Sequence, residues 1–115
     1  MANTQAMCTS FKGELLVGHH NFGTGVVRAA TTADTFKAAL YLASATVNAS
    51  TTAYSATNEV SGTGYTAGGV TVTFGTAPST SGTTAFVTPS ASIAFTSVTL
   101  STAFDAVLIY NSTQS

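Results

Sequence analysis

Charged side chains are scarce in this chain of 115 residues, which has three Lys and Arg and four Asp and Glu. A typical soluble domain is about one quarter charged, whereas the charged fraction here is 6%. Proteins that bind nucleic acids need clustered Lys and Arg to neutralise phosphates. The net charge of −1 therefore excludes a strong electrostatic surface for DNA or RNA.

Cysteine and long apolar runs are also scarce. The one cysteine, Cys8, cannot form an internal disulfide. No apolar run approaches the roughly 18 residues that a membrane-spanning helix needs. Residues 1–10 lack the basic and apolar regions of a secretory signal. We therefore expect a protein of a reducing cytosol, or of a particle assembled there.

Hydroxyl side chains are abundant instead, since 36 residues are Ser or Thr. The mean hydropathy is +0.33, and a positive value with so little net charge is typical of a chain that folds. The length suits one domain. We expect an N-terminal arm at residues 1–9 and a single β domain at residues 10–115.

Alternation of apolar and polar residues predicts most of the secondary structure. Residues 34–43 carry two conflicting signals, because Thr31 and Asp34 have the spacing of a helix capping box while Phe36, Ala38 and Leu40 alternate with a strand period. The regular alternation decides for a strand. Further strands are expected at 70–74, 92–95, 98–100 and 104–110, and an edge strand is expected after a loop that begins at residue 46.

Other segments predict turns and one helix. A short helix is expected near residues 10–18, with Ser10 as its N-cap and Phe11 paired with Leu15. Turns or loops are expected at 19–25, 58–69 and 77–82. The apolar run 104–110 predicts a strand covered on both faces. Together these elements predict an all-β fold, an antiparallel β-sandwich or jelly-roll-like domain with an extended arm.

The residues that could carry catalysis or bind a metal are few and isolated. His19 and His20 are adjacent, so they point to different sides, and no Cys, His or carboxylate nearby completes a metal site. Nothing around Cys8 resembles an activated thiolate. The acids, which are far apart in sequence, are Glu14, Asp34, Glu59 and Asp105. We therefore predict no enzyme activity, no metal and no cofactor.

Two motif-like patterns are better explained by composition. The glycines between Gly62 and Gly69 lack the GK[ST] ending of a phosphate-binding loop and suit hairpin geometry. Asn48 and Asn111 begin glycosylation sequons, which in a chain so rich in Ser and Thr, with no secretion signal, are expected by chance.

Four segments of the chain resemble a family of small virion proteins of tailed bacteriophages. These segments are 34–41, 48–54, 59–69 and 104–110, and the run Glu-Val-Ser-Gly-Thr-Gly-Tyr at 59–65 is the most specific of them. They span about two thirds of the chain. The resemblance implies a structural role in the particle, foremost as a capsid decoration (cement) protein that contacts the major capsid protein and copies of itself as a homo-oligomer. Family members continue beyond the last strand, which implies completion of the sheet by further strands or by a neighbouring subunit.

This reading predicts contacts chosen by shape rather than by chemistry. A near-neutral surface lets identical copies crowd together without repulsion, and an extended arm can add a strand to a neighbour. The arm and the glycine-rich segment are the expected contact regions. The candidate interface residues are Met7, Phe11, Tyr54, Glu59, Val60 and Tyr65. A tail or fibre component is an alternative, and so is a carbohydrate-binding module that stacks sugars on Tyr41, Tyr54, Tyr65 or Tyr110.

Overall fold

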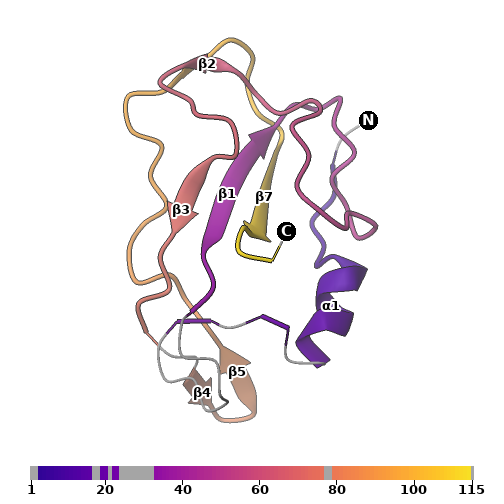
Figure 1. Cartoon of the computed structure of the whole chain (residues 1–115), viewed down its shortest axis with the longest axis vertical. Helices are drawn as coiled ribbons and strands as arrows, with labels where there is room; N and C mark the ends of the chain where they lie inside the picture. Colours follow the sequence, from indigo (N-terminus) through magenta and orange to yellow (C-terminus); the bar gives the residue numbers. More distant parts are fainter. Residues whose placement is uncertain (1–2, 17–18, 21, 24–32, 77–78, 115) are drawn as a thin grey trace.

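The computed structural model describes residues 3–16, 19–20, 22–23, 33–76 and 79–114. One helix and seven strands make up its regular structure (Figure 1). Their bounds are α1 Thr9–Leu16, β1 Phe36–Tyr41, β2 Gly62–Thr63, β3 Val70–Val72, β4 Ser79–Ser81, β5 Thr84–Phe86, β6 Thr99–Leu100 and β7 Ala106–Asn111. The all-β prediction is confirmed, as is the short helix near its expected place.

Strand β1 lies at the centre of the main sheet. The order of this antiparallel sheet is β3-β1-β7, and Ala38 of β1 pairs with Val70 on one side and Ile109 on the other. Because successive side chains of a strand point to opposite faces, Phe36 and Ala38 face one way and Ala39 and Tyr41 the other. All four are buried, so both faces of β1 are covered.

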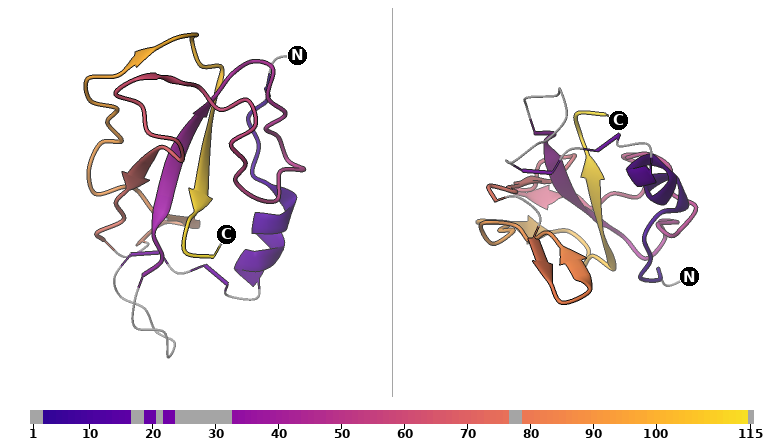
Figure 2. Two further views of the ribbon diagram at one scale, coloured as in Figure 1. Left: turned by 45° about the horizontal axis from the view of Figure 1, so that its top comes forward. Right: turned by 90° about the horizontal axis from the view of Figure 1, so that it is seen from below.

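Each face of the sheet has its own apolar cluster. On one face Phe36, Ala38 and Val72 pack with aromatic residues and Ile93. The other face carries a cluster built on Ala39, Tyr41, Ala45 and Leu108. The covering residues on both faces come largely from loops, and two ribbons, β2–β6 and β4–β5, complete the described sheets (Figure 2).

Several expected elements differ in their bounds. Helix α1 begins at Thr9, so Ser10 is not the N-cap; its hydroxyl donates to the carbonyl oxygen of Thr51 instead. Residues 92–95, expected as a strand, are irregular, since Ile93 and Phe95 pack onto β1 as covering residues without joining a ladder. The residues after the 46–54 loop make one isolated bridge, Tyr41 to Glu59, in place of an edge strand. Thr31, Thr32 and part of the 19–25 turn lie outside the described residues.

The segment 77–82, expected as a loop, instead contributes a strand to a hairpin. Ser81 pairs with Thr84 across a loop of two residues, Gly82 and Thr83, and Gly82 has a φ of +58°. Glycine at the first loop position with positive φ is typical of a type II′ hairpin turn. Pro78 lies outside the described residues.

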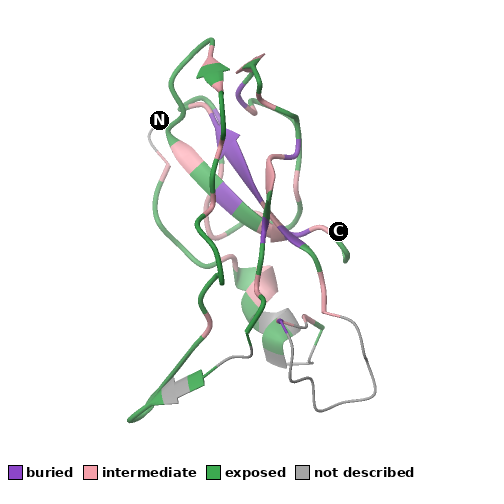
Figure 3. Ribbon diagram, turned by 90° about the vertical axis from the view of Figure 1, so that its left-hand side faces the viewer, coloured by how far each residue is buried: buried purple, intermediate pink, exposed green. Residues whose placement is uncertain are grey.

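Strand β7 is not covered on both faces, contrary to expectation. Leu108 is buried against Ala39, but Val107 and Ile109 are 48% and 50% exposed. The reason is the position of β7 at the edge of the sheet. The loops that cover β1 do not extend over the side chains of Val107 and Ile109 (Figure 3).

Candidate functional site

A groove lies beside the free edge of β7. In Figures 1 and 2 this strand lies between β1 and α1. Residues of both β7 and α1 line the groove, which therefore lies on the side of β7 that faces α1. Its volume is about 810 Å³. We call it the β7 groove; its walls are residues 3–8 of the arm, Ser10 and Phe11 of α1, parts of the segment 47–54, and residues 105–111.

The backbone of β7 is unpaired on the groove side. The N–H of Ser112 donates to the carbonyl oxygen of Thr35, so in this antiparallel ladder the even-numbered residues of β7 turn their backbone groups toward β1. The backbone N–H and C=O of Val107 and Ile109 therefore point away from β1. No described residue forms a hydrogen bond with them. An unpaired edge of this kind is a template on which a further strand can add.

The side chains of this edge are apolar and exposed. Val107 and Ile109 lie on the same face as Leu40 and Ala38, their partners across the ladder. Phe104, just before the strand, is 49% exposed as well. The exposed pair Val107 and Ile109 is the kind of apolar surface that marks contact with another protein.

The groove is nearly uncharged. Asp105 is the only Asp, Glu, Lys or Arg among the described residues that line it. Its Oδ2 accepts hydrogen bonds from the backbone N–H of Asn3 at 3.1 Å and from Nδ2 of Asn3 at 2.8 Å. These bonds, the backbone one first, lower the pKa of the Asp105 carboxyl. They also fix the start of the arm beside the start of β7.

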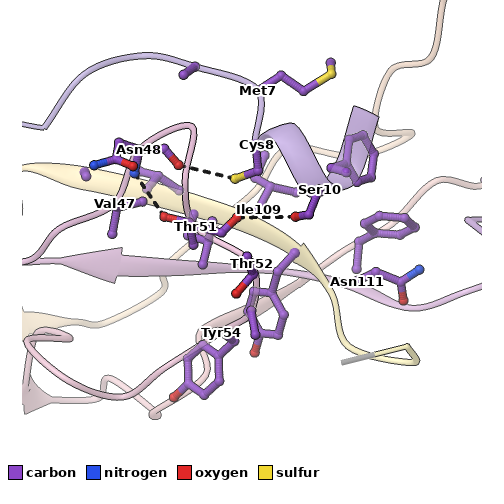
Figure 4. A pocket seen from close by; sticks show the side chains of 18 of the residues that line it. Met7, Cys8, Ser10, Val47, Asn48, Thr51, Thr52, Tyr54, Ile109 and Asn111 are labelled. Atoms are coloured by element: carbon purple, nitrogen blue, oxygen red, sulfur yellow. Dashed lines mark hydrogen bonds between the residues drawn. The ribbon is translucent and has the colours of Figure 1, made fainter. Parts of the chain in front are cut away.

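The arm and α1 are held on the far side of the groove by the segment 47–54 (Figure 4). The N–H of Thr9 donates to the carbonyl oxygen of Ala49 at 2.8 Å, and the thiol of Cys8 lies 3.6 Å from the carbonyl oxygen of Asn48. Asn3 Oδ1 accepts from the N–H of Val47 at 3.1 Å. The thiol of Cys8 is thus occupied by a structural contact.

All four tyrosines of the chain gather around Glu59, next to the groove. Tyr54 donates to Oε2 of Glu59 at 2.6 Å, and Tyr65 donates to Oε1 at 2.6 Å. The N–H of Gly68 also donates to Oε1, at 2.8 Å. Tyr110 stacks on Tyr54 with ring centroids 4.8 Å apart and donates to the carbonyl oxygen of Gly68.

This tyrosine–Glu59 cluster joins distant segments to the sheet. Tyr41 donates to the carbonyl oxygen of Ser55, and the Tyr65 hydroxyl accepts from the N–H of Leu40. The hydrogen bond to Glu59, followed by burial, raises the pKa of Tyr54, while burial, followed by that hydrogen bond, raises the pKa of Tyr65. Burial is the main cause of the raised pKa values of Tyr41 and Tyr110. The cluster fastens the 54–69 segment onto β1 and β7.

A second polar cluster closes the end of β7. Asn111 is buried; its Nδ2 donates to Oδ2 of Asp34 at 2.7 Å and lies 2.7 Å from Nδ1 of His20. Its Oδ1 accepts from the N–H groups of Thr113 and Gln114. Ring contacts join His20 to Phe11 and to His19, at 4.7 and 5.0 Å between centroids. The two histidines thus take part in packing, and the described residues contain no group of three or more Cys, His, Asp or Glu suited to a metal.

The candidate interface residues lie in three places, and Tyr54 belongs both to the groove and to the tyrosine–Glu59 cluster. Met7, Phe11 and Tyr54 line the groove, and Met7 is 52% exposed. Glu59 and Tyr65 belong to the tyrosine–Glu59 cluster. Val60 is buried in the core, where its N–H donates to the carbonyl oxygen of Leu40.

The sequence does not predict that Val107 and Ile109 are exposed, because an apolar run is equally typical of a central strand and of an edge strand. A central strand and an edge strand differ in their place in the sheet order, and the periodicity of the sequence does not reveal that order.

Comparison of the chain with models of protein families, with curated proteins and with solved structures finds no match. Among the described residues, no helix has the length and apolar character needed to cross a membrane.

Proposed function

We propose that this protein is a structural component of a tailed-bacteriophage virion, namely a capsid decoration (cement) protein that acts through protein–protein contacts. The observation that carries the proposal is the unpaired, apolar edge of β7 beside a nearly uncharged groove. A decoration protein must offer neutral surfaces that pack and form backbone hydrogen bonds. The resemblance of the segments 34–41, 48–54, 59–69 and 104–110 to small virion proteins supports the particle as the setting.

The acidic groups support a structural rather than a chemical role. The carboxylates of Asp34, Glu59 and Asp105 each accept hydrogen bonds from neighbours in the chain. Each set of bonds fixes a segment: the end of β7, the 54–69 segment and the arm. An acid that catalyses proton transfer must reach the substrate in a cleft. Of these three acids only Asp105 lines the β7 groove, and there its Oδ2 accepts two hydrogen bonds from Asn3.

The tyrosines bear on the alternative of a sugar-binding module. Such a module presents open aromatic faces on which a sugar stacks. Here each tyrosine hydroxyl donates to a group of the chain itself, and the rings of Tyr54 and Tyr110 stack on each other. This arrangement favours the protein-contact proposal, whereas a tail or fibre role would use the same surfaces and differs in location and copy number.

The test is the position of the chain on purified particles. Antibody labelling in cryo-electron microscopy and quantitative mass spectrometry should find many copies distributed over the head. A few copies at one vertex would indicate the tail, and a chain absent from particles would overturn the proposal. Particles stripped of the protein should lose resistance to heat or chelators and regain it on addition of purified wild-type protein.

A further inference from the structure

The hairpin formed by β4 and β5 projects from the body of the protein. Every described residue from Ser81 to Phe86 is exposed, and Phe86 remains 44% exposed (Figure 3). Neither of its strands pairs with another described strand. A two-stranded hairpin alone in water is marginally stable, because it needs a third strand or a packing surface. The projecting hairpin therefore lacks a partner within the described chain.

The β7 groove offers what the hairpin lacks. Its edge presents the backbone N–H and C=O of Val107 and Ile109, and its exposed side chains are apolar. The two surfaces are also compatible in charge, since residues 79–87 contain no charged side chain and Asp105 is the one charged group among the described residues of the groove. Neither surface would bury an unpaired charge, the costliest event at an interface.

We propose that the β4–β5 hairpin of one copy adds to the β7 edge of a second copy, so that the sheet continues from β7 into β5 and β4 of that neighbour. This inference deepens the proposed function by naming a second copy of the chain as the partner of the groove. Strand addition of this kind gains affinity from backbone hydrogen bonds and specificity from alternate side chains.

The pairing places the aromatic side chain of the hairpin well. In an antiparallel pair, residues directly opposite each other have their side chains on the same face. With Ala85 opposite Ile109, the small Ala85 side chain lies beside Ile109, and Phe86 turns to the other face of the sheet. That side of the groove is lined by Val47, Tyr54 and Leu108. Phe86 then has an apolar site and becomes the anchor of the contact.

A two-fold pairing of β7 with β7 is disfavoured by the surroundings of the strand. Helix α1 and the arm lie beside the free edge (Figures 1 and 2), so a second whole sheet would meet them. A slim hairpin presents only two strands. Because the hairpin and the groove are different surfaces of one chain, the contact is head-to-tail and generates rings or open rows of copies.

Complementary variants test this geometry in solution. Phe86→Ser removes the anchor but leaves the groove intact, while Ile109→Pro removes one outward N–H and leaves the hairpin intact. Proline is tolerated in an edge strand where its N–H faces outward, and Ile109→Thr is the matched control that keeps this N–H. Circular dichroism and thermal unfolding establish that each variant folds.

Sedimentation velocity over a range of concentrations gives the readout. Wild-type protein should associate beyond the dimer, and each of the two variants alone should lose affinity by about tenfold or more. In their mixture, the intact hairpin of the Ile109→Pro protein can bind the intact groove of the Phe86→Ser protein. The other hairpin and groove of that pair are altered, so the mixture should form dimers and nothing larger. Association by each variant alone at the wild-type level would overturn the proposal, as would a wild-type protein that remains monomeric at millimolar concentration.

Cysteine cross-linking identifies the two surfaces directly and does not depend on whether proline is tolerated. In a Cys8→Ser background, Ala85→Cys protein mixed with Ile109→Cys or Val107→Cys protein should give a disulfide-linked dimer under mild oxidation. Ala85→Cys mixed with Thr57→Cys, another exposed position, is the control and should not cross-link efficiently. Dimers formed by Ile109→Cys alone would indicate two-fold pairing and overturn the head-to-tail contact.

These measurements use the purified protein alone. Their failure would therefore leave the virion role open to its own test, and absence of the chain from particles would not affect a head-to-tail contact measured in solution.

Discussion

Replacement of Glu59 by alanine is expected to destabilise the fold markedly, because this carboxylate accepts three hydrogen bonds from two tyrosines and a backbone N–H. A hydrogen bond to a charged group contributes about 1.5–3 kcal/mol when buried. Glu59 is only half-buried, so water can replace part of each bond, and about 1 kcal/mol per bond is the better value. The free energy of unfolding should therefore fall by about 3 kcal/mol, and Tm by about 12 °C for a chain of this size.

Urea and thermal unfolding, followed by circular dichroism, measure this loss. Tyr54→Phe is the matched control, because it removes one bond to Glu59 and keeps the ring that stacks on Tyr110; it should cost about 1 kcal/mol. The double variant should cost less than the sum of the two, since both changes remove the same bond. A Glu59→Ala protein within about 0.5 kcal/mol of wild type would refute the structural role assigned to the cluster.

Three further predictions concern pH and backbone geometry. The bonds from Asn3 lower the pKa of Asp105 below its usual 3.8. Their contribution to the free energy of unfolding is therefore present above pH 3.8 and is lost as the pH falls through the lowered pKa. The Asn3 amide resonance should titrate with a midpoint below 3.8, and a higher midpoint would contradict this. The pKa values of the four tyrosines are raised above 10.0, so the free energy of unfolding should decline as the pH rises above 10.0. Phenolate absorbance should appear only as the protein unfolds. A tyrosine that ionises near pH 10.0 in the folded protein would count against this prediction. Gly69→Ala should lower the free energy of unfolding by more than about 3 kcal/mol, because the φ of Gly69 is +79° and a Cβ there would overlap the carbonyl oxygen of Ala38. Gly82→Ala, with open space around it, should lower it by about 1–2 kcal/mol. Urea unfolding measures both, and equal losses would exclude the overlap as the cause.

Strand β1 could be predicted from the sequence because its local pattern and its final environment agree. Phe36, Ala38 and Leu40 alternate with residues of the opposite face, and the small Ala38 and Ala39 allow cover to approach from both sides. The competing capping-box signal is local, whereas the strand alternation extends along the whole segment.

The role of β7 could not be predicted in the same way. Residues 104–110 form the most apolar run of the chain, and such a run indicates a strand without indicating how many neighbours the strand has. Its position at the sheet edge depends on its pairing with β1 alone. The exposure of Val107 and Ile109 depends on how far the covering loops extend. That information lies in long-range contacts.

The polar cluster shows a similar division. Tyr54, Glu59 and Tyr65 stand out within a short segment, and the sequence predicts them as contact residues. Tyr41 and Tyr110 join them only because β1 and β7 are neighbours.

The hairpin at 79–86, by contrast, has a local signal: Gly82 and Thr83 form a two-residue loop between segments rich in Thr and Ser. The abundance of hydroxyl residues and the nearby Pro78 favoured a plain loop instead.

The order of strands in the main sheet has a consequence for the synthesis of this protein. Residues of β1 pair with residues of β7 that lie 65 to 75 positions later in the chain, and no hairpin joins two strands of that sheet. On the ribosome, β1 therefore emerges long before its outer partner exists. Contacts of such wide sequence separation make folding slow, and the unpaired central strand is prone to aggregate while it waits. The loop residues that later cover this strand, among them Phe74, Ile93 and Phe95, also emerge after it, so its apolar faces stay open during the same interval.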